Sequence, residues 1–353
     1  MIDKGFWCDK TVLITGHTGF KGSWLCKTLS MLKANVVGYS LVPLDKSNLF
    51  EIGGVEKFSK NIFADIRNLE LLKNAINENK PEIVFHLAAQ PIVRESYNKP
   101  EYTYDVNVMG TVNILEAIRQ SESVRSFVNV TTDKVYLNNE SFWGYRETDT
   151  LDGYDPYANS KSCSELVTAS YKRSFLQNIS VSTCRAGNVI GGGDFAADRI
   201  IPDCIKASSV NSPIIIRNPN AIRPYQFVLE PIFAYLLIAQ EQYKSPEKYQ
   251  GTYNIGPNTD DCVTTEVLVR MFCDIWGSNA RWEYSQDLVK QPHESNVLRL
   301  DCSKLRNIFS WQPKYDIYAA LQKTVEWFKA YSSNNNVITV MENQISEFIT
   351  GRS

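Results

Sequence analysis

The sequence has few histidines, no excess of either charge and no long apolar run. Only His17, His86 and His293 are present among its 353 residues, so a zinc site is not expected. Lysine plus arginine total 37 and aspartate plus glutamate 39, a formal net charge of −2, which excludes a dedicated, strongly basic nucleic-acid binder. No run approaches the ~20 apolar residues that span a bilayer, and Met1–Cys8 lacks a signal-peptide pattern, so no membrane association is expected.

The cysteine content and the length limit the remaining classes. The eight cysteines include no Cys-x-x-Cys pair. This spacing indicates buried, reduced thiols and hence a cytoplasmic protein. The apolar fraction of 43% and the charged fraction of 22% are ordinary for a soluble enzyme. A single core stops growing at roughly 250–300 residues, so we expect one large domain with an annex, or two unequal lobes.

Strand-like runs alternate with amphipathic helical stretches over the first 190 residues. The expected strands are Thr11–Thr15, Asn35–Leu41, Asn61–Asp65, Pro81–Leu87, Arg125–Val130 and Ile179–Arg185. The expected helices are Lys21–Ala34, Leu69–Asn79, Tyr102–Arg119 and Pro156–Phe175. This alternation predicts an α/β fold with a doubly wound, Rossmann-like parallel sheet.

The alternation ends after Arg185. Glycines in Gly187–Asp194 predict a loop. The shorter elements expected beyond it are Ile200–Ser208, Ile214–Arg217, Pro231–Tyr243, Thr252–Ile255, Thr264–Trp276, Ala280–Tyr284 and Tyr315–Tyr331, of which Thr252–Ile255 returns to the main sheet. The expected organisation is a dinucleotide-binding domain (1–188, with 226–256), a smaller mixed α/β substrate-binding lobe (189–225 and 257–332), and a tail (333–353) joined flexibly through Ser332–Asn336.

A glycine triplet follows the first strand. Gly16, Gly19 and Gly22 form G-x-x-G-x-x-G where a helix begins, which is typical of a turn that binds a dinucleotide pyrophosphate. A plain strand-to-helix turn is the alternative. The second strand ends without an acidic residue, so spacing leaves NAD and NADP both open. Asp65 is either an adenine contact or a helix N-cap.

Two further patterns carry reactive side chains. Tyr157 and Lys161 are four residues apart on one expected helix face, so the lysine can lower the pKa of the phenol and make it a base near neutral pH. The alternative is two surface residues. Thr131–Lys134 closes the fifth strand at the edge where such sheets bind ligands. From the residues alone this segment is equally a strand-end turn with an Asp–Lys pair.

Several longer segments together resemble the extended short-chain dehydrogenase/reductase family, and within it the sugar-nucleotide 4,6-dehydratases. They are Gly16–Leu25 (GHTGFKGSWL), His86–Tyr97, Thr131–Tyr136 (TTDKVY), Trp143–Asp149, Asp155–Lys161, Arg185–Pro202 and Arg217–Pro231. The likeness runs from Thr11 to about Pro313. Most of these dehydratases carry Thr-Asp-Glu where this chain has Thr132–Lys134, and its Thr-Asp-Lys is similar to the CDP-glucose branch. That branch usually has tryptophan and histidine at Tyr225 and Phe227.

The resemblance implies conversion of a CDP-hexose, CDP-D-glucose, into the 4-keto-6-deoxy sugar by NAD-mediated hydride transfer from C4 to C6 with loss of water. It implies a role in deoxysugar biosynthesis, including that of lipopolysaccharide O-antigen. Tyr157, helped by Lys161 and Thr132, would deprotonate the 4-hydroxyl. Lys134 would take the C5 proton, for which it must be neutral, and Asp133 would protonate the departing 6-hydroxyl.

The resemblance also implies the binding residues and the assembly. The expected NAD contacts are Gly16, Thr18, Gly19, Phe20, Gly22, Asp65, Ile66, Leu87, Ala88, Ala89, Tyr157 and Lys161. The expected substrate contacts are Gln90, Arg94, Asn188, Arg199, Arg223 and Arg299, although each arginine is otherwise a surface ion-pair partner. Tyr102–Arg119 and Pro156–Phe175 correspond to helices that pair in a homodimer or a dimer of dimers.

Other functions are compatible with the same residues. A different nucleotide-hexose 4,6-dehydratase or a nucleotide-sugar 4-epimerase would use the same scaffold, and an epimerase would not need Asp133 and Lys134. A non-catalytic NAD-sensing regulator is another alternative, although such proteins commonly lack the tyrosine or the lysine, and this chain has both Tyr157 and Lys161. A reductase using free NADPH would consume added cofactor stoichiometrically.

Overall fold

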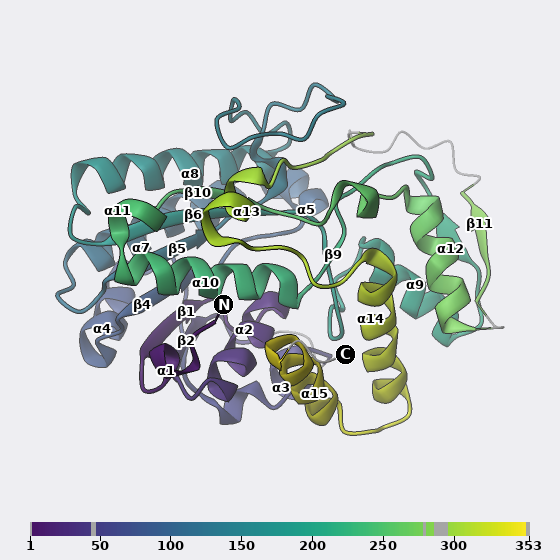
Figure 1. Cartoon of the computed structure of the whole chain (residues 1–353), viewed down its shortest axis with the longest axis horizontal. Coiled ribbons are helices and arrows are strands. Elements are labelled where there is room, and N and C mark those ends of the chain that lie inside the picture. The colour runs from purple at the N-terminus through teal and green to yellow at the C-terminus, as the bar shows by residue number, and fades with distance from the viewer. Residues whose placement is uncertain (1, 44–46, 278–279, 286–295, 351–353) are drawn as a thin grey trace.

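A parallel seven-stranded sheet forms the centre of the protein in the computed structural model, which describes residues 2–43, 47–277, 280–285 and 296–350 (Figure 1). Its strand order is β10-β6-β5-β4-β1-β2-β3. The strands are β1 (Thr11–Thr15), β2 (Asn35–Ser40), β3 (Ser59–Phe63), β4 (Ile83–His86), β5 (Ser126–Val130), β6 (Ser180–Ala186) and β10 (Thr252–Ile255). The predicted doubly wound sheet is confirmed, including the return of Thr252–Ile255, which pairs with β6.

Alternating side chains of each strand pack into two separate hydrophobic cores. On β1, Val12 and Ile14 belong to the core that includes Trp24, whereas Leu13 belongs to the core that includes Ile114. Successive residues of a strand point to opposite faces, and helices cover both faces of this sheet. Helices α2 (Phe20–Met31) and α10 (Leu229–Lys244) cover one face, and α4 (Leu69–Asn79), α7 (Gly110–Arg119) and α8 (Pro156–Ser174) cover the other.

Two elements of this half differ from the sequence prediction. The third strand, expected at Asn61–Asp65, is β3 (Ser59–Phe63), because Val36–Ser40 of β2 pair with these five residues and leave Asp65 beyond the strand end. The helix expected over Tyr102–Arg119 is α6 (Pro100–Tyr104), a π-helical turn η2 (Asp105–Met109) and α7. The short helices α1 (Lys4–Trp7), α3 (Leu49–Ile52) and α5 (Val93–Asn98), and the turns η1 (Val55–Lys57) and η3 (Asp133–Val135), complete this half.

Four of the smaller elements of the second half, α9, α12, α14 and β11, are grouped at one end of the molecule beyond the sheet (Figure 1). Parallel pairs join β8 (Ile214–Ile216) to β11 (Trp282–Tyr284), and β7 (Val189–Ile190) to β9 (Gln226–Phe227). Gly187–Asp194 therefore contains a short strand where only a loop was expected. The other helical elements of the second half are α9 (Ile200–Ser209), α11 (Pro246–Tyr249), η4 (Thr259–Asp261), α12 (Thr265–Trp276), α13 (Ser303–Phe309) and α14 (Ile317–Ser332), of which α11 packs on α10 and α13 on β10.

The segment after Ser332–Asn336, expected to be a tail, contains the helix α15 (Val337–Thr350). Met341, Ile345 and Phe348 lie on one face of this helix and are buried in the larger core. Lys27 of α2, itself buried, forms a 2.6 Å ion pair with Glu342. Helix α15 thus packs on α2. Residues 351–353 of the expected tail lie outside the described ranges.

The expectation of buried, reduced cysteines is met in part. All eight cysteines are free thiols, but only Cys26, Cys184, Cys204 and Cys302 are buried. No helix within the described ranges combines the length and the hydropathy needed to cross a bilayer.

Candidate active site

The glycine turn after β1 has no room for a side chain at two of its three glycines, Gly16 and Gly22. Gly16 has φ +74°, and a Cβ there would lie 2.7 Å from the backbone nitrogen of Ala88. A Cβ on Gly22 would lie 2.2 Å from the carbonyl oxygen of Gly16. Helix α2 begins at Phe20 behind Gly19, which provides no side-chain cap. The first amides of α2 therefore suit an anion such as a pyrophosphate.

The ends of β2 and β3 lie next to this turn. The hydroxyl of Thr18 is 2.9 Å from that of Ser40. Asp65 is not the N-cap of the following helix, because Asn68 caps α4. The Asp65 carboxylate instead accepts from the Arg67 guanidinium at 2.7 Å, and this interaction lowers the pKa of Asp65. Ile66 is buried, and its side chain lies where a Cβ on Gly110 would come within 2.8 Å.

The chain leaving β4 runs alongside the glycine turn. Leu87 and Ala88 bind Thr15 through their amides, at 3.0 Å to its carbonyl and 3.2 Å to its hydroxyl. Ala89 follows and is half-buried. Gln90 is buried, and its side-chain amide binds the backbone of Ile92 and the hydroxyl of Thr103. The side-chain amide of Gln90 thus stabilises its own loop.

Tyr157 lies in the first turn of α8, which Asp155 caps by accepting from the Ala158 amide at 2.9 Å. Burial raises the pKa of the Tyr157 phenol to about 12, and a hydrogen bond with Thr132 opposes that shift. The spacing predicted that Lys161 lowers this pKa, but burial has the larger effect and raises it. The contact with Thr132 nevertheless joins the phenol to the end of β5.

Asp133 is the buried acid beside this phenol. Burial raises its pKa, while Lys134, the Thr132 hydroxyl and the charge of Arg223 oppose the increase. Its Oδ1 accepts from the Thr132 hydroxyl at 3.0 Å, and its Oδ2 is buried with no hydrogen-bond partner among the described residues. A buried carboxyl oxygen without a partner is suited to meet a ligand group.

Lys161, one turn further along α8, is buried beneath the same strand end. Its ammonium donates to the carbonyl of Val130 at 3.3 Å. Burial and the charge of Lys21 lower its pKa to about 7, and Glu165 acts in the opposite direction. Lys21, within the glycine motif, has its own pKa lowered to about 8 by burial and by Arg199.

The predicted substrate arginines fall into two groups. The charge of Arg223 lowers the pKa of Asp133, and that of Arg199 lowers the pKa of Tyr157. The charge of Arg299 lowers the pKa of the Cys262 thiol, which the charge of Asp133 raises. Arg199 is also paired with Asp194 at 2.9 Å, and the buried Nε of Arg299 has no partner within the described part of the chain. The second group consists of Arg94, which pairs with Asp198 at 3.0 Å and is 41% exposed. Asn188, also a predicted substrate contact, accepts a hydrogen bond from the Gln226 amide through its backbone carbonyl.

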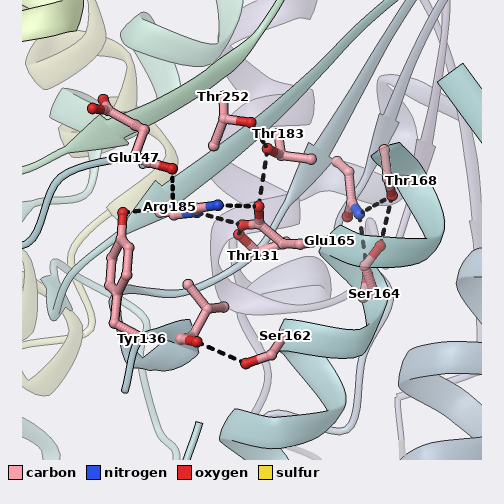
Figure 2. A network of polar contacts seen from close by, with 12 residues as sticks. Thr131, Tyr136, Glu147, Ser162, Ser164, Glu165, Thr168, Thr183, Arg185 and Thr252 are labelled. Carbon is pink, nitrogen blue, oxygen red and sulfur yellow. Dashed lines mark hydrogen bonds and ion pairs between the residues drawn. The ribbon is translucent and has the colours of Figure 1, made fainter. Parts of the chain in front are cut away.

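Three charged residues next to this cluster were not among the predicted site residues. Lys21 was hidden within the glycine motif. Glu165 follows Tyr157 by eight residues and Lys161 by four, so its place on that helix face was readable from spacing. Arg185 at the end of β6 forms a buried ion pair with Glu165, shown in Figure 2. Only the fold brings these two side chains together.

The geometry defines a dinucleotide-binding α/β protein with a tyrosine, an acid and lysines at the carboxyl edge of its sheet. A family model described as GDP-mannose 4,6 dehydratase matches residues 13–324. The chain therefore belongs to the sugar-nucleotide dehydratase family of extended short-chain dehydrogenase/reductases.

Individual relatives give finer comparisons. The chain is 43% identical to a CDP-glucose 4,6-dehydratase of Salmonella typhimurium over 357 residues, covering 99% of both chains. In structure it is similar to dTDP-glucose 4,6-dehydratase of Bacillus anthracis in complex with NAD, with a TM-score of 0.75, 21% identity, and coverage of 93% and 99%. UDP-glucose 4-epimerase of Thermotoga maritima gives a TM-score of 0.79 at 22% identity, with coverage of 91% and 99%. These two structures agree on the fold.

Proposed function

We propose that the chain is an NAD-dependent CDP-glucose 4,6-dehydratase, a hydro-lyase that forms CDP-4-keto-6-deoxy-D-glucose. The observation that carries this function is the 43% identity over 99% of both chains to a CDP-glucose 4,6-dehydratase. The buried Asp133, next to Lys134 and close to Tyr157, supplies the groups that a dehydration needs beyond an oxidation.

The turn between β1 and α2 fits a dinucleotide, because the first amides of α2 have no side-chain cap and the close backbone approach at Gly16 and Gly22 tolerates no Cβ atom. The first amides of α2 behind Gly19 would hold the pyrophosphate of NAD, which would supply the hydride acceptor and donor for the internal transfer from C4 to C6. Thr18, Gly19, Phe20, Asp65, Ile66 and Leu87–Ala89 line the adjoining strand ends and complete the proposed cofactor site.

The residues of this chain then divide the proton transfers. Tyr157 removes the proton from the 4-hydroxyl. Thr132 stabilises the phenolate through the hydrogen bond that lowers the pKa of Tyr157, and its hydroxyl proton is available for this when Asp133 is protonated and no longer accepts it. Lys161, four residues further along the same helix face, is held beneath β5 by its hydrogen bond to the carbonyl of Val130. The 4-ketone acidifies the C5 proton, which Lys134 removes in its neutral form.

Asp133 is the acid that protonates the departing 6-hydroxyl. Burial raises its pKa, which favours the protonated carboxyl that this role requires. Arg199, Arg223 and Arg299 bind the diphosphate and sugar, because guanidinium groups match phosphate oxygens through paired donors. Gln90, Arg94 and Asn188 are the further substrate contacts that the family resemblance implies.

Side-by-side assays with CDP-, dTDP-, UDP- and GDP-glucose test the substrate. We expect CDP-glucose alone to give, at high rate, a ketone product that absorbs in alkali, with deuterium from C4 recovered in the new methyl group. A galacto-sugar would indicate a 4-epimerase, and loss of the C4 label to water would contradict the internal transfer. Binding of NAD without turnover of any sugar nucleotide would favour a regulator.

Exchange of the C5 proton tests the roles of Lys134 and Asp133 separately. In heavy water, Lys134→Ala is expected to lose C5 exchange because the base is absent. Asp133→Asn is expected to retain C5 exchange but to lose water elimination, because the acid is absent. Exchange at the wild-type rate in Lys134→Ala would refute the assignment of the base.

We further propose a homodimer, or a dimer of dimers, assembled through α7 and α8. Apolar side chains on or beside these helices are exposed, including Met109, Leu166 and Phe175. Such a surface suits a helical dimer interface. Leu166→Asp is expected to shift the protein toward a monomer in sedimentation velocity, and an unchanged mass would exclude this interface.

A further inference from the structure

A buried ion pair between Glu165 of α8 and Arg185 of β6 lies directly behind the catalytic strand end (Figure 2). Arg185 donates from Nε to Oε1 at 2.8 Å and from its terminal nitrogen to Oε2 at 2.6 Å. Both side chains are only 3% exposed. Two parallel hydrogen bonds of this kind fix the orientation of both groups as well as their distance.

Glu165 connects helix α8 to the residue just before the catalytic threonine. Its Oε1 accepts from the hydroxyl of Thr131 at 2.6 Å. Because α-helical residues four apart share a face, Tyr157, Lys161 and Glu165 follow one another along the side of α8 that meets the sheet. The carboxylate thus ties the helix that carries the phenol to the start of the segment Thr131–Tyr136.

Arg185 connects the same pair to the other end of that segment. It donates to the hydroxyl of Tyr136 at 2.7 Å, and its guanidinium lies 4.8 Å from the centre of the Tyr136 ring. The Tyr136 hydroxyl in turn donates to Asn254 at 2.6 Å. Between the two ends, Ser162 of α8 donates to the carbonyl of Val135 at 2.8 Å.

We propose that the Glu165–Arg185 pair is a positioning element of the reaction, holding Asp133 and Lys134 against Tyr157 by fixing both ends of Thr131–Tyr136. The proposal rests on the proposed function of those three residues. A buried ion pair adds little net stability compared with a well-packed apolar pair, because desolvating both charges offsets their attraction. The pair acts here by holding the two ends of the segment, Thr131 through Glu165 and Tyr136 through Arg185.

Hydroxyl deletions at the two ends test this without leaving a charge unpaired. In Thr131→Val and Tyr136→Phe, the segment that carries Asp133 and Lys134 loses one anchor. We expect C5 exchange and water loss to fall at least 10-fold while the KM for CDP-glucose changes less than 3-fold. Reduced cofactor, followed near 340 nm, should then accumulate, because the oxidation step keeps Tyr157 and Lys161.

The double variant Glu165→Met with Arg185→Met separates positioning from stability. It removes both charges together, so we expect it to fold with a melting temperature near that of the wild type and to show the same loss of elimination. Lys27→Met is the matched control, since it breaks another pair with a buried lysine, between Lys27 and Glu342. It should lower the melting temperature with turnover per folded molecule unchanged.

Amide hydrogen exchange of residues 132–135 in the NAD-bound protein gives a second readout that needs no turnover. We expect these amides to exchange at least 10-fold faster than in wild type in Thr131→Val, in Tyr136→Phe and in the double variant. Wild-type exchange and a wild-type ratio of elimination to oxidation would overturn the proposal. If the wild-type protein converts no nucleotide hexose, the proposed function fails, and hydrogen exchange alone decides whether the pair holds the segment.

Discussion

The ammonium group of Lys161 lies 3.3 Å from the carbonyl oxygen of Val130, the last residue of β5. This hydrogen bond ties helix α8 to the strand end from which Thr132 and Asp133 extend. It also keeps the lysine buried, and burial is the main reason that its pKa is lowered to about 7. The charge of Lys161 is therefore sensitive to its neighbours near neutral pH.

Removing the charge of Lys21 is expected to raise the pKa of Lys161. Lys21 lowers that pKa as a nearby cation, so in Lys21→Met the protonated form persists to higher pH. We expect an upward shift of roughly 0.5–1 unit, seen by NMR titration of selectively labelled lysine and in the pH profile of kcat. Lys4→Met, at an exposed lysine, is the control, and an equal shift there would contradict the assignment.

Loss of the Thr132 hydroxyl is expected to make Tyr157 a weaker base. The hydrogen bond opposes burial, so in Thr132→Val the pKa of Tyr157 rises further above 10 and less phenolate exists at neutral pH. The rate of cofactor reduction should fall about 10-fold at pH 7, with its basic limb moved to higher pH, and Thr132→Ser should restore it. Tyr157→Phe should lose roughly 10²–10⁴-fold at every pH, and unchanged reduction would exclude the phenolate role.

A methyl group at Gly22 is expected to weaken NAD binding. The added Cβ would lie 2.2 Å from the Gly16 carbonyl oxygen, so the turn must shift and its amides move. We expect the Kd for NAD, measured by calorimetric titration, to rise at least 10-fold. Gly251→Ala is the control, because its nearest contact would be 3.5 Å. Equal affinities in the two variants would remove the glycine turn from the cofactor site.

Glu230 makes stability depend on pH. Burial raises its pKa to about 7 from 4.5, so the folded state holds the proton more tightly than the unfolded state. This contribution is complete below about pH 4.5 and is lost as pH rises through 7, and at about 1.4 kcal/mol per unit it amounts to up to about 3 kcal/mol. Urea unfolding at pH 5 and 8 should show a smaller decrease for Glu230→Gln than for wild type.

The amide that replaces the carboxyl group in Glu230→Gln keeps an oxygen that can accept hydrogen bonds. The backbone amides of Lys314 and Tyr315 donate to Oε1 of Glu230 at 2.8 and 2.9 Å in the wild-type protein, so both donors retain an acceptor in the variant. Glu247→Gln, at an exposed position, controls for the change in net charge. A pH dependence identical to wild type in Glu230→Gln would show that another group carries it.

Most strands and helices around the sheet were predictable because each has a local pattern. Thr11–Thr15 is a short apolar run before glycine, and the helix from Pro156 starts with a capping aspartate and proline. Helix α15 lacked such a signal at its start, since Ser332–Asn336 resembles the beginning of a tail. Its burial depends on the larger core and on Lys27, more than 300 positions earlier, which no local pattern encodes.

The sequence by itself determined the parallel sheet, the glycine turn and the Tyr157–Lys161 spacing, because these follow from residue type and short periodicity. Which charges interact follows only from the fold: Lys21 lowers the pKa of Lys161, Arg223 lowers that of Asp133, and Arg185 forms an ion pair with Glu165. The fold also buries Tyr157, and this burial raises the pKa of the phenol, whereas the spacing to Lys161 predicted a lowered pKa. Pairing and desolvation depend on how distant strands pack at one sheet edge, and spacing along the chain does not contain that information.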